Sequence, residues 1–414
     1  MEKIIPFKGI RPIKSLVEKI AVFHNNLMNE PERKEEARKN PYSIAHVIKP
    51  RIDFADDVSK TDPRIFDHAK KYYWKLLLDK ILVEEPEKCF YVYRQMLDGR
   101  SQTGVVACYH VDEYLNGNIK KHEHTREEKE AENVEHMMTV GINANPIFLA
   151  YNPVHEIDTL INQVKATVPE YHFVSDNNVY HSLWVLSDAE LISKLKNLFN
   201  EKVSVSYIAD GHHRAAASAR VAKLMREANP KHRGDEPYNY LFTCLFPANQ
   251  LKIYDYNRVV KEHDEISDDE LFEKVKEKFE VREIKESSYS PSAFHKIGMY
   301  LGEHWFELEP KPGSFHDDPI GRLDVSILQK NILSPLLGIS DPRTDKRIDF
   351  YAGIKGLSSL EKKVDKGKAA IAFSLFPVSM QQLMDVSDAG EIMPPKSTWF
   401  EPKLLSGLII YSIR

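Results

Sequence analysis

Cysteine is scarce in this sequence: only Cys89, Cys108 and Cys244 occur among 414 residues. None of them shows the short paired spacing of metal-binding or disulfide-rich modules, which excludes a zinc ribbon and a disulfide framework. Each lies in or beside an apolar segment that predicts a strand, so we expect small core residues rather than nucleophiles. A chain of this kind fits a reducing compartment.

Long hydrophobic runs and an excess of positive charge are also missing. Apolar stretches such as 371–376 are far shorter than the roughly 20 residues that cross a bilayer, and Pro6 interrupts the apolar start of the chain too early for a secretion signal. Lys and Arg number 57 against 62 Asp and Glu, and this net charge of −5 argues against nucleic-acid binding, as does the lack of a helix-turn-helix pattern. We therefore expect a cytoplasmic protein without membrane or nucleic-acid partners.

What is present is a mixture of strand and helix patterns, with 42% apolar residues and length enough for two or three domains. Two aromatic and β-branched runs around Asp98-Gly99 predict a hairpin, and Thr125, three places before Glu128, predicts a capped helix. Further strands are predicted over 147–151, 203–209, 240–246, 251–256, 304–308, 369–376 and 404–413, and helices up to Ala228 and over 268–279 and 323–333. The charged run 258–267 predicts a boundary between an N-terminal α/β region, 1–260, and a C-terminal α+β region, 261–414.

The strongest chemical signal is Asp210-Gly211-His212-His213-Arg214, which stands between an apolar strand and an alanine-rich helix. The unpaired amides and the positive dipole end of a helix start favour an anion. Gly211 permits a sharp turn, and Arg214 can hold oxygens with its planar guanidinium. The turn predicts a phosphate site formed by Gly211, His212, His213 and Arg214. Asp210 would then hold Mg²⁺, cap the helix or accept a hydroxyl proton.

Two other interpretations of these five residues stay open. They could form an ordinary helix start, with Asp210 as the N-cap, Gly211 in the turn and both histidines on the surface. A metal site built on His212 and His213 is the weaker alternative, because adjacent helical residues point in different directions and no third ligand is evident.

The five-residue turn, preceded by Tyr207-Ile208-Ala209, resembles the signature of the family called domain of unknown function 1015. The resemblance extends over most of the chain, including segments 6–12, 40–43, 121–125 and 394–403. That family is similar to the superfamily of ParB-type nucleotide-binding proteins, sulfiredoxin and an archaeal free serine kinase, whose related turns bind nucleotide phosphates. The resemblance implies a mixed α/β fold, with additional helices around a ParB/sulfiredoxin-like core. It also implies ATP, ADP or CTP as the nucleotide, together with Mg²⁺.

Glu123 and His122 precede the helix predicted near Thr125, and the resemblance makes both of them catalytic candidates. Glu123 could act as a general base or as a Mg²⁺ ligand, assisted by His122, and a merely structural loop is the alternative. The spacing of His122 and His124 around Glu123 is not that of a zinc protease helix, and no Pro-Cys-x-x-Cys follows to complete a deaminase signature.

A proline-stiffened segment near the C-terminus, 394–403, is the predicted lid. Lys396, Ser397 and Thr398 follow two prolines and offer one cation and two hydroxyls to a carboxylate or phosphate of the substrate. The alternative is a rigid connector to the last strand. Arg11 is a further candidate for binding an anionic substrate group, against the alternative of an ordinary surface arginine.

Two segments depart from the family's pattern. Residues 23–26 read Phe-His-Asn-Asn where many members have Pro-Tyr-Asp, and residues 132–133 read Glu-Asn where Asp-Arg is usual. The resemblance predicts an ATP- or ADP-dependent phosphotransferase acting on a small hydroxyl metabolite, with free serine as the preferred acceptor. The departures favour the alternative of a nucleotide-gated regulatory or adaptor protein without turnover. A homodimer is compatible with both.

Overall fold

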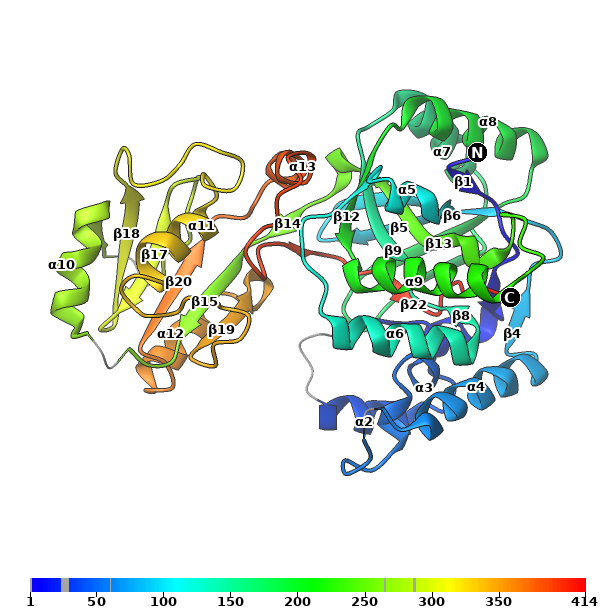
Figure 1. Ribbon diagram of the computed structural model, residues 1–414, viewed down its shortest axis with the longest axis horizontal. Helices are drawn as coiled ribbons and strands as arrows, with labels where there is room; N and C mark the ends of the chain where they lie inside the picture. The colour runs from blue at the N-terminus through cyan, green and yellow to red at the C-terminus, as the bar shows by residue number, and fades with distance from the viewer. Residues whose placement is uncertain (1, 24–29, 60, 264–265, 286–287) are drawn as a thin grey trace. The chain divides into compact units, whose positions relative to one another are not determined.

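The computed structural model describes residues 2–23, 30–59, 61–263, 266–285 and 288–414, and the chain divides into two compact units (Figure 1). Unit 1 comprises Met1–Lys120, His124–Leu251 and Pro402–Arg414, and unit 2 comprises Lys121–Glu123 and Lys252–Glu401. The sequence predicts a single division after residue 260, whereas the units divide after Leu251 and the C-terminal segment returns to unit 1. The charged run 258–267 does not separate the units, because its residues Val259 and Val260 are buried in a strand of unit 2.

Unit 1 contains a mixed sheet with the strand order β10-β11-β5-β6-β13-β9-β12-β7, in which β1 also pairs with β6. Its strands are β1 (Ile4–Ile5), β5 (Phe90–Leu97), β6 (Arg100–His110), β7 (Ile119–Lys120), β9 (Ile147–Tyr151), β10 (Tyr171–Val174), β11 (Tyr180–Leu186), β12 (Ser206–Asp210) and β13 (Tyr240–Pro247). Three small pairs complete the unit: β2 (Ile10–Pro12) with β4 (Leu82–Glu84), β3 (Val22–Phe23) with β22 (Leu405–Ser406), and β8 (Ile142–Asn143) with β23 (Tyr411–Ser412). The long strand predicted over 404–413 is thus two short ones.

The predicted hairpin is confirmed in β5 and β6. Leu97 pairs with Arg100, and the two residues between them, Asp98 and Gly99, both have positive φ angles, of 50° and 74°. Positive φ at both central positions is what a tight two-residue hairpin turn requires, and Asp-Gly adopts it readily.

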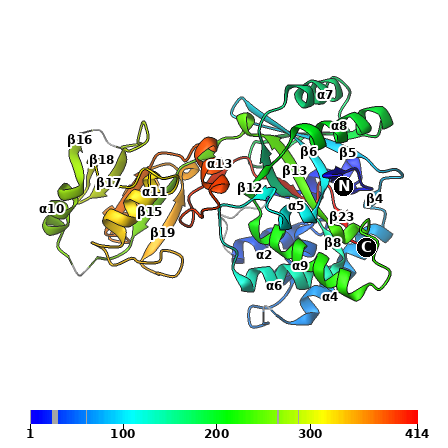
Figure 2. The same ribbon diagram turned by 45° about the horizontal axis from the view of Figure 1, so that its top comes forward.

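Some helices of unit 1 pack on this sheet, and others pack on one another. They are α1 (Val17–Ile20), α2 (Glu30–Lys39), α3 (Ala45–Ile48), α4 (Pro63–Leu78), α5 (Val111–Leu115), α6 (Glu127–Val140), α7 (His155–Lys165), α8 (Ala189–Lys202) and α9 (His212–Ala228), with 3₁₀ turns η1 (Lys14–Leu16), η2 (Pro50–Asp53), η3 (Pro237–Asn239) and η4 (Ala248–Gln250). Helix α9 packs on β9 and β13 on one side and on α6 on the other (Figures 1 and 2). Its buried Ala215, Ala219 and Ala222 join the same core as Leu149 and Leu241, because small side chains let the helix lie close to the strands.

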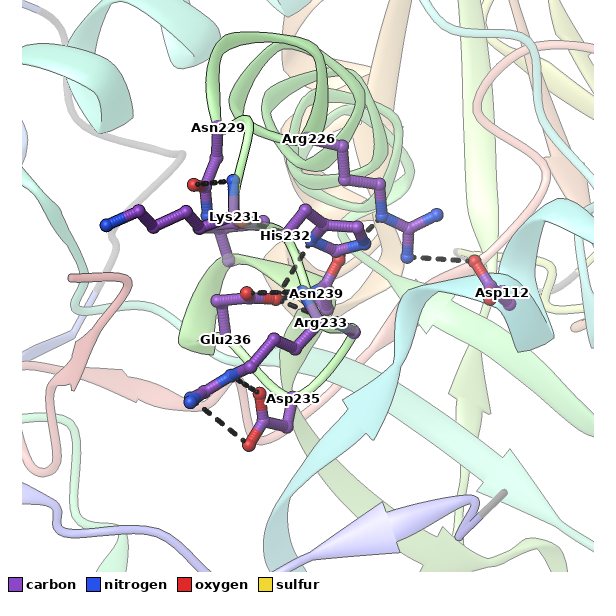
Figure 3. A network of polar contacts seen from close by, with 11 residues as sticks. Asp112, Arg226, Asn229, Lys231, His232, Arg233, Asp235, Glu236 and Asn239 are labelled. Carbon is purple, nitrogen blue, oxygen red and sulfur yellow. Dashed lines mark hydrogen bonds and ion pairs between the residues drawn. The ribbon is translucent and has the colours of Figure 1, made fainter.

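The C-terminal end of α9 is anchored by the polar network of Figure 3. The Arg226 guanidinium donates from Nε to Oδ1 of Asn239 over 2.6 Å and forms an ion pair of 3.0 Å with Asp112. Glu236 accepts from the backbone amides of Arg233 and Gly234, over 2.7 and 2.9 Å. Burial would raise the pKa of Glu236, but these amide bonds outweigh it and lower the pKa to about 2. The network fixes the far end of the helix whose first turn carries the Asp-Gly-His-His-Arg motif.

The capped helix predicted at Thr125 forms, but its cap is different. Helix α6 begins at Glu127 with Arg126 as the N-cap, and no side chain caps it. The Thr125 hydroxyl instead donates to Glu130 over 3.5 Å. The predicted capping box is therefore wrong, and the three acidic residues of the first turn stabilise the helix start through the dipole.

Unit 2 contains a six-stranded antiparallel sheet in the order β16-β18-β17-β20-β15-β19. Its strands are β15 (Tyr256–Val260), β16 (Phe279–Ile284), β17 (Ile297–Leu301), β18 (His304–Pro310), β19 (Ile348–Ala352) and β20 (Ile371–Leu375), beside the small pair β14 (Ile253–Tyr254) and β21 (Trp399–Phe400). Its helices are α10 (Asp268–Lys278), α11 (Asp324–Leu328), α12 (Ser358–Asp365) and α13 (Met380–Asp388), with the π-helical turn η5 (Gln329–Leu333) and the 3₁₀ turn η6 (Gly353–Lys355). The predicted mixed α/β class is confirmed in both units.

None of the helices in the described ranges is both long and apolar enough to span a bilayer. The three cysteines are buried and free, as predicted for core residues. Burial raises the pKa of the Cys89 thiol to about 11, which leaves it protonated and unreactive at neutral pH.

Candidate functional site

The Asp-Gly-His-His-Arg segment lies where the predicted strand ends and the predicted helix begins. Strand β12 pairs antiparallel with β9 with its register shifted between Ile208 and Asp210, so the strand bulges just before the turn. A bulge re-aims the following side chain, and here it precedes Asp210. Gly211, and not Asp210, is the N-cap of α9. The alternative with Asp210 as an N-cap is therefore wrong.

Gly211 is required by the geometry of this turn. Its φ of +104° is left-handed, and a Cβ added there would lie 2.8 Å from Nη2 of Arg214. Only glycine combines this backbone conformation with so close an approach. The guanidinium of Arg214 therefore folds back over the turn instead of pointing away from it.

Arg214 is held by three acceptors. Its Nη1 donates to Asn145 Oδ1 and, over 2.7 Å, to the carbonyl oxygen of Pro146, and its Nη2 donates to Asp210 Oδ2 over 2.7 Å. These bonds use three of the five N–H donors of a guanidinium. The pKa of Arg214 is lowered, because the effect of burial outweighs the charge of Asp210, which would raise it. These bonds fix the guanidinium in position.

Asp210 is paired with two cations. Besides Arg214 on Oδ2, Lys403 Nζ donates to Oδ1 over 3.1 Å. Burial would raise the pKa of Asp210, but the charges of Lys403 and Arg214 outweigh it and hold the pKa well below its usual value. A carboxylate of such low basicity is a poor proton acceptor while these pairs persist. No local pattern pointed to Lys403 in this role, because the two paired residues are 193 positions apart.

The two histidines of the turn have different environments. His212 is buried, with 4% exposure, whereas His213 is half-buried and accepts at Nε2 from the backbone amide of Arg126 over 3.0 Å. This bond joins the first turn of α9 to the start of α6. The two side chains do not share one environment, and among the described residues no group of three His, Cys, Asp or Glu side chains has the geometry of a metal site.

Arg11 also lies in unit 1, but its donors are engaged elsewhere. Its Nε donates to Glu85, and its Nη1 donates to Glu170 over 2.9 Å and to the hydroxyl of Tyr171 over 3.0 Å. Burial would lower the pKa of Arg11, but the bonds to Glu85 and Tyr171 outweigh it and raise the pKa above its usual value. An anionic substrate group at Arg11 would have to compete with two carboxylates.

His122 and Glu123 belong to unit 2. His122 is buried; its carbonyl oxygen accepts from the amide of Met393 over 3.0 Å, and its Nε2 lies 3.5 Å from the Thr398 hydroxyl. The charge of Glu123 contributes to raising the pKa of Tyr256, mainly an effect of burial, to about 12. The structure thus brings His122 and Thr398, two separately predicted residues, into contact.

The segment predicted as a lid is tied down within unit 2. Ser397 donates from its hydroxyl to Pro394 O over 2.6 Å, and Lys396 Nζ lies 5.8 Å from the ring centre of Tyr256. Strand β21 follows at once and pairs with β14. These contacts are compatible with a rigid connector as well as with a lid.

A small cavity beside this segment contains two charged residues that sequence reasoning missed. Arg258 and Asp324 line it, with exposures of 2% and 4%. Arg258 donates to the carbonyl oxygens of Tyr256 and Pro395, while Oδ2 of Asp324 has no hydrogen-bond partner. The cavity has a volume of about 10 Å³, which is room for one water molecule.

The expected magnesium ion fits these residues poorly. Both oxygens of Asp210 already contact cations of the protein, and Glu123 is not part of any three-ligand group among the described residues. A magnesium ion prefers carboxylates that are not already paired with cations.

The two departures from the family's pattern have different outcomes. His24 to Asn26 lie outside the described residues. Glu132 lies on α6, where its charge faces Lys49 and raises the pKa of that ammonium against larger opposing effects. The unusual residue at position 132 is therefore part of the surroundings of Lys49.

Comparison with solved structures finds distant likenesses. Free serine kinase in complex with AMP is 16% identical, with 71% of this chain and 86% of that chain covered and a TM-score of 0.37. A conserved hypothetical protein from Pyrococcus furiosus is 16% identical over 72% of this chain and 92% of that one, with a TM-score of 0.36. SbnI with a C-terminal truncation, from Staphylococcus aureus, is 10% identical over 73% and 85%, also with a TM-score of 0.36.

A match to a protein family, unlike these distant likenesses, shows where the chain belongs. No curated protein matches the chain. The family described as "Protein of unknown function (DUF1015)" matches residues 4–326, well over half of the sequence and including the whole Asp210–Arg214 turn. The chain belongs to the DUF1015 family.

Proposed function

We propose that this protein binds a nucleotide by its phosphates at the Asp210–Arg214 turn and transfers a phosphoryl group to a small hydroxyl metabolite, with free serine as the preferred acceptor. The observation that carries the proposal is the left-handed Gly211 at the N-cap of α9, with the guanidinium of Arg214 close against it. Amides and guanidinium donors then converge on one place, as a phosphate requires.

The available interactions are of the right strength. A charge-assisted hydrogen bond contributes about 1.5–3 kcal/mol and a helix dipole about 0.3–1 kcal/mol. Two or three such bonds from Arg214 and the amides of His212 and His213 reach roughly micromolar affinity for a nucleotide. ATP, ADP and CTP all present the phosphates that this site would hold.

Within this proposal we assign a role to each of the remaining residues. Asp210 orients Arg214 and Lys403, because its paired carboxylate is a weak base. Glu123, with His122 beside it, is then the preferred acceptor of the hydroxyl proton, and Lys396, Ser397 and Thr398 bind the acceptor's carboxylate. In this account Arg11 is a secondary anion contact. A cytoplasmic location and a homodimer complete the proposal.

The test is turnover by the purified protein. Incubated with ATP or ADP and serine, it should form phosphoserine, and Glu123→Gln should abolish the product while leaving nucleotide affinity unchanged. Labelled nucleotide that stays intact across a panel of hydroxyl metabolites would rule out the transferase.

A second function, a nucleotide-gated regulatory or adaptor protein, is favoured by one observation: the ion pairs of Asp210 deprive the turn of a ready base. It predicts ligand-induced thermal stabilisation without product, together with a change in the mass of the assembly. Stabilisation with product formation would exclude it.

A further inference from the structure

The helical part of unit 1 contains two imidazoles gathered around one carboxylate. The two oxygens of Asp53 on η2 lie 2.8 and 2.9 Å from Nδ1 of His46 on α3. Oδ2 of Asp53 also lies 2.7 Å from Nε2 of His68 on α4. The three elements pack on one another, and α3 and α4 lie side by side in Figure 1. None of the three residues belongs to the candidate site described above.

Both ring nitrogens of His46 face hydrogen-bond acceptors. Nδ1 faces the Asp53 carboxylate, and Nε2 lies 3.2 Å from the carbonyl oxygen of Asn40, just after α2. A neutral imidazole has a single N–H, so it can donate to one of these acceptors and must turn a lone pair toward the other. An imidazolium donates to both. The geometry therefore favours the charged form of His46.

The surroundings of the ring also favour its charge. Tyr72 stacks on His46, with ring centres 4.7 Å apart and an angle of 18° between the planes, and an aromatic face attracts a cation. The His46 side chain is 7% exposed, so water screens its pair with Asp53 only weakly. Burial would lower the pKa of His46, but the bonds to Asp53 and Asn40 outweigh it and raise the pKa.

Other charged and titratable groups on the elements around α3 have partners of their own. Arg51 on η2 donates to the carbonyl oxygen of Asp56 over 3.3 Å, and Lys75 on α4 lies 6.0 Å from the ring centre of Tyr72. His136 on α6 bonds to a carbonyl oxygen of α3 over 2.8 Å, and burial lowers the pKa of its imidazole. The carboxylate on η2 is therefore the charge that governs protonation of the imidazole on α3.

The segment 40–54, which contains α3, is held to α4 near both of its ends. Near its start, the carbonyl oxygen of Pro41 accepts from the hydroxyl of Tyr72. Near its end, Asp53 bonds to His68. Both Tyr72 and Asp53 also contact the imidazole ring of α3, so this ring lies between the two connections.

We propose that His46, Asp53 and His68 form a pH-sensitive clasp, which holds residues 40–54 against α4 while His46 is charged and loosens them once His46 is neutral. Loss of the proton converts the ion pair with Asp53 into a hydrogen bond of a neutral ring. It also leaves one of the two acceptors of His46 facing a lone pair.

The pH range of the clasp follows from the two groups. The folded-state pKa of His46 lies above its usual 6.5, so its stabilisation is complete below 6.5 and is lost as pH rises through the folded-state pKa. Burial would raise the pKa of Asp53, but the bonds to His46 and His68 outweigh it and lower the pKa below 3.8. The contribution of Asp53 is therefore complete above 3.8. The clasp is closed between these limits and opens on the alkaline side.

The test is hydrogen exchange of the full chain, measured by mass spectrometry in peptides covering 40–54 and corrected for the intrinsic effect of pH on exchange. We expect their protection in wild type to fall about tenfold between pH 6 and pH 9, the scale of one charge-assisted hydrogen bond. In His46→Gln, whose amide can donate to Asp53 but does not titrate, protection should be lower than in wild type at pH 6. It should then change by less than about twofold up to pH 9.

His304→Gln is the matched control, because His304 pairs with Glu283 over 3.2 Å but is 62% exposed. The peptides covering 40–54 should follow wild type in this variant at every pH. A retained pH dependence in His46→Gln, or equal wild-type protection at pH 6 and pH 9, would overturn the clasp.

A second measurement needs no variant and so does not depend on whether His46→Gln folds. NMR of the histidine ring nitrogens in wild type should find both nitrogens of His46 protonated at pH 6.5 and its titration at higher pH. A neutral His46 ring at pH 6.5 would contradict the inference. Neither measurement involves a nucleotide, so the clasp and the proposed function stand or fall separately.

Discussion

The ammonium of Lys403 lies 3.1 Å from Oδ1 of Asp210, although 193 positions separate the two residues in the chain. This pair and the bond from Arg214 to Oδ2 make Asp210 the centre of a charged triad at the start of α9. The triad explains why the turn's only acid need not repel a phosphate: its charge is more than balanced by two cations that the fold delivers to it.

Replacing Asp210 by Asn should reduce stability at neutral pH and matter less in acid. The pKa of the folded-state carboxyl lies below its usual 3.8, so its stabilisation is complete above that value and is lost as pH falls through it toward the folded-state pKa. We expect about 1 kcal/mol at pH 7, because the side chain is 39% exposed and solvent screens the pairs.

Chemical denaturation across pH 2–7 measures this difference. Asp235→Asn, on an exposed ion pair with Arg233, is the control and should change the free energy of unfolding by less than about 0.5 kcal/mol. A destabilisation by Asp210→Asn that persists unchanged below pH 3 would contradict the assignment.

Gly211→Ala should lower both the affinity for nucleotide and the free energy of unfolding. The new methyl group meets the Arg214 guanidinium in a left-handed backbone, so the guanidinium must move. Gly234→Ala is the matched control, because Gly234 has a similar φ of +99° with nothing within 4 Å of an added Cβ. Both variants should lose about 1 kcal/mol of stability, but only Gly211→Ala should lose affinity for nucleotide in a titration. Equal affinities would show that the position of Arg214 is unimportant.

Asp324→Asn should stabilise unit 2 at alkaline pH. Burial raises the pKa of Asp324 to about 6 from 3.8, so folding is penalised progressively as pH rises from 3.8 through 6, by about 3 kcal/mol in full. Asparagine removes that penalty and can still accept from the His295 amide.

Hydrogen exchange in the strands 297–301 and 371–375 reads this effect within unit 2. Exchange should slow in Asp324→Asn at pH 8 and match wild type at pH 4. Asp324→Ala, which leaves the His295 amide without its acceptor, should speed exchange at both pH values. Equal protection of Asp324→Asn and wild type at pH 8 would mean that burial does not raise the pKa of the Asp324 carboxyl.

Chelation of divalent metal should leave nucleotide binding nearly intact. The oxygens of Asp210 are already in contact with Lys403 and Arg214, so Asp210 is poorly suited to bind a metal. In the proposed site the protein's own cations neutralise the phosphates. We expect excess EDTA to change the dissociation constant for ADP by less than about threefold, since no protein–metal bond is lost. Binding that vanishes in EDTA and returns with magnesium would restore Asp210 as a metal ligand.

Local sequence patterns predict much of the fold. The Asp98-Gly99 hairpin, the buried strand 147–151 and the helix ending at Ala228 each follow from turn chemistry or periodicity over a few residues. The same local reasoning misplaced the cap of α6, because Thr125 found a partner in Glu130 instead of the helix amides. It also missed that the C-terminal segment returns to unit 1, which depends on long-range strand pairing such as β22 with β3.

The candidate site divides in the same way. The sequence places a phosphate turn at Asp210–Arg214, because strand, glycine and helix start are contiguous. It could not supply Lys403 or the two buried charged residues Arg258 and Asp324, since each reaches its neighbours only through tertiary packing.

The most direct test of the account is a calorimetric titration of ADP into wild type and Arg214→Ala, with thermal unfolding of both recorded beside it. The account predicts micromolar binding to wild type and binding weakened about tenfold or more in the variant, with the fold retained. Equal binding by both proteins, or no binding by wild type, would contradict it.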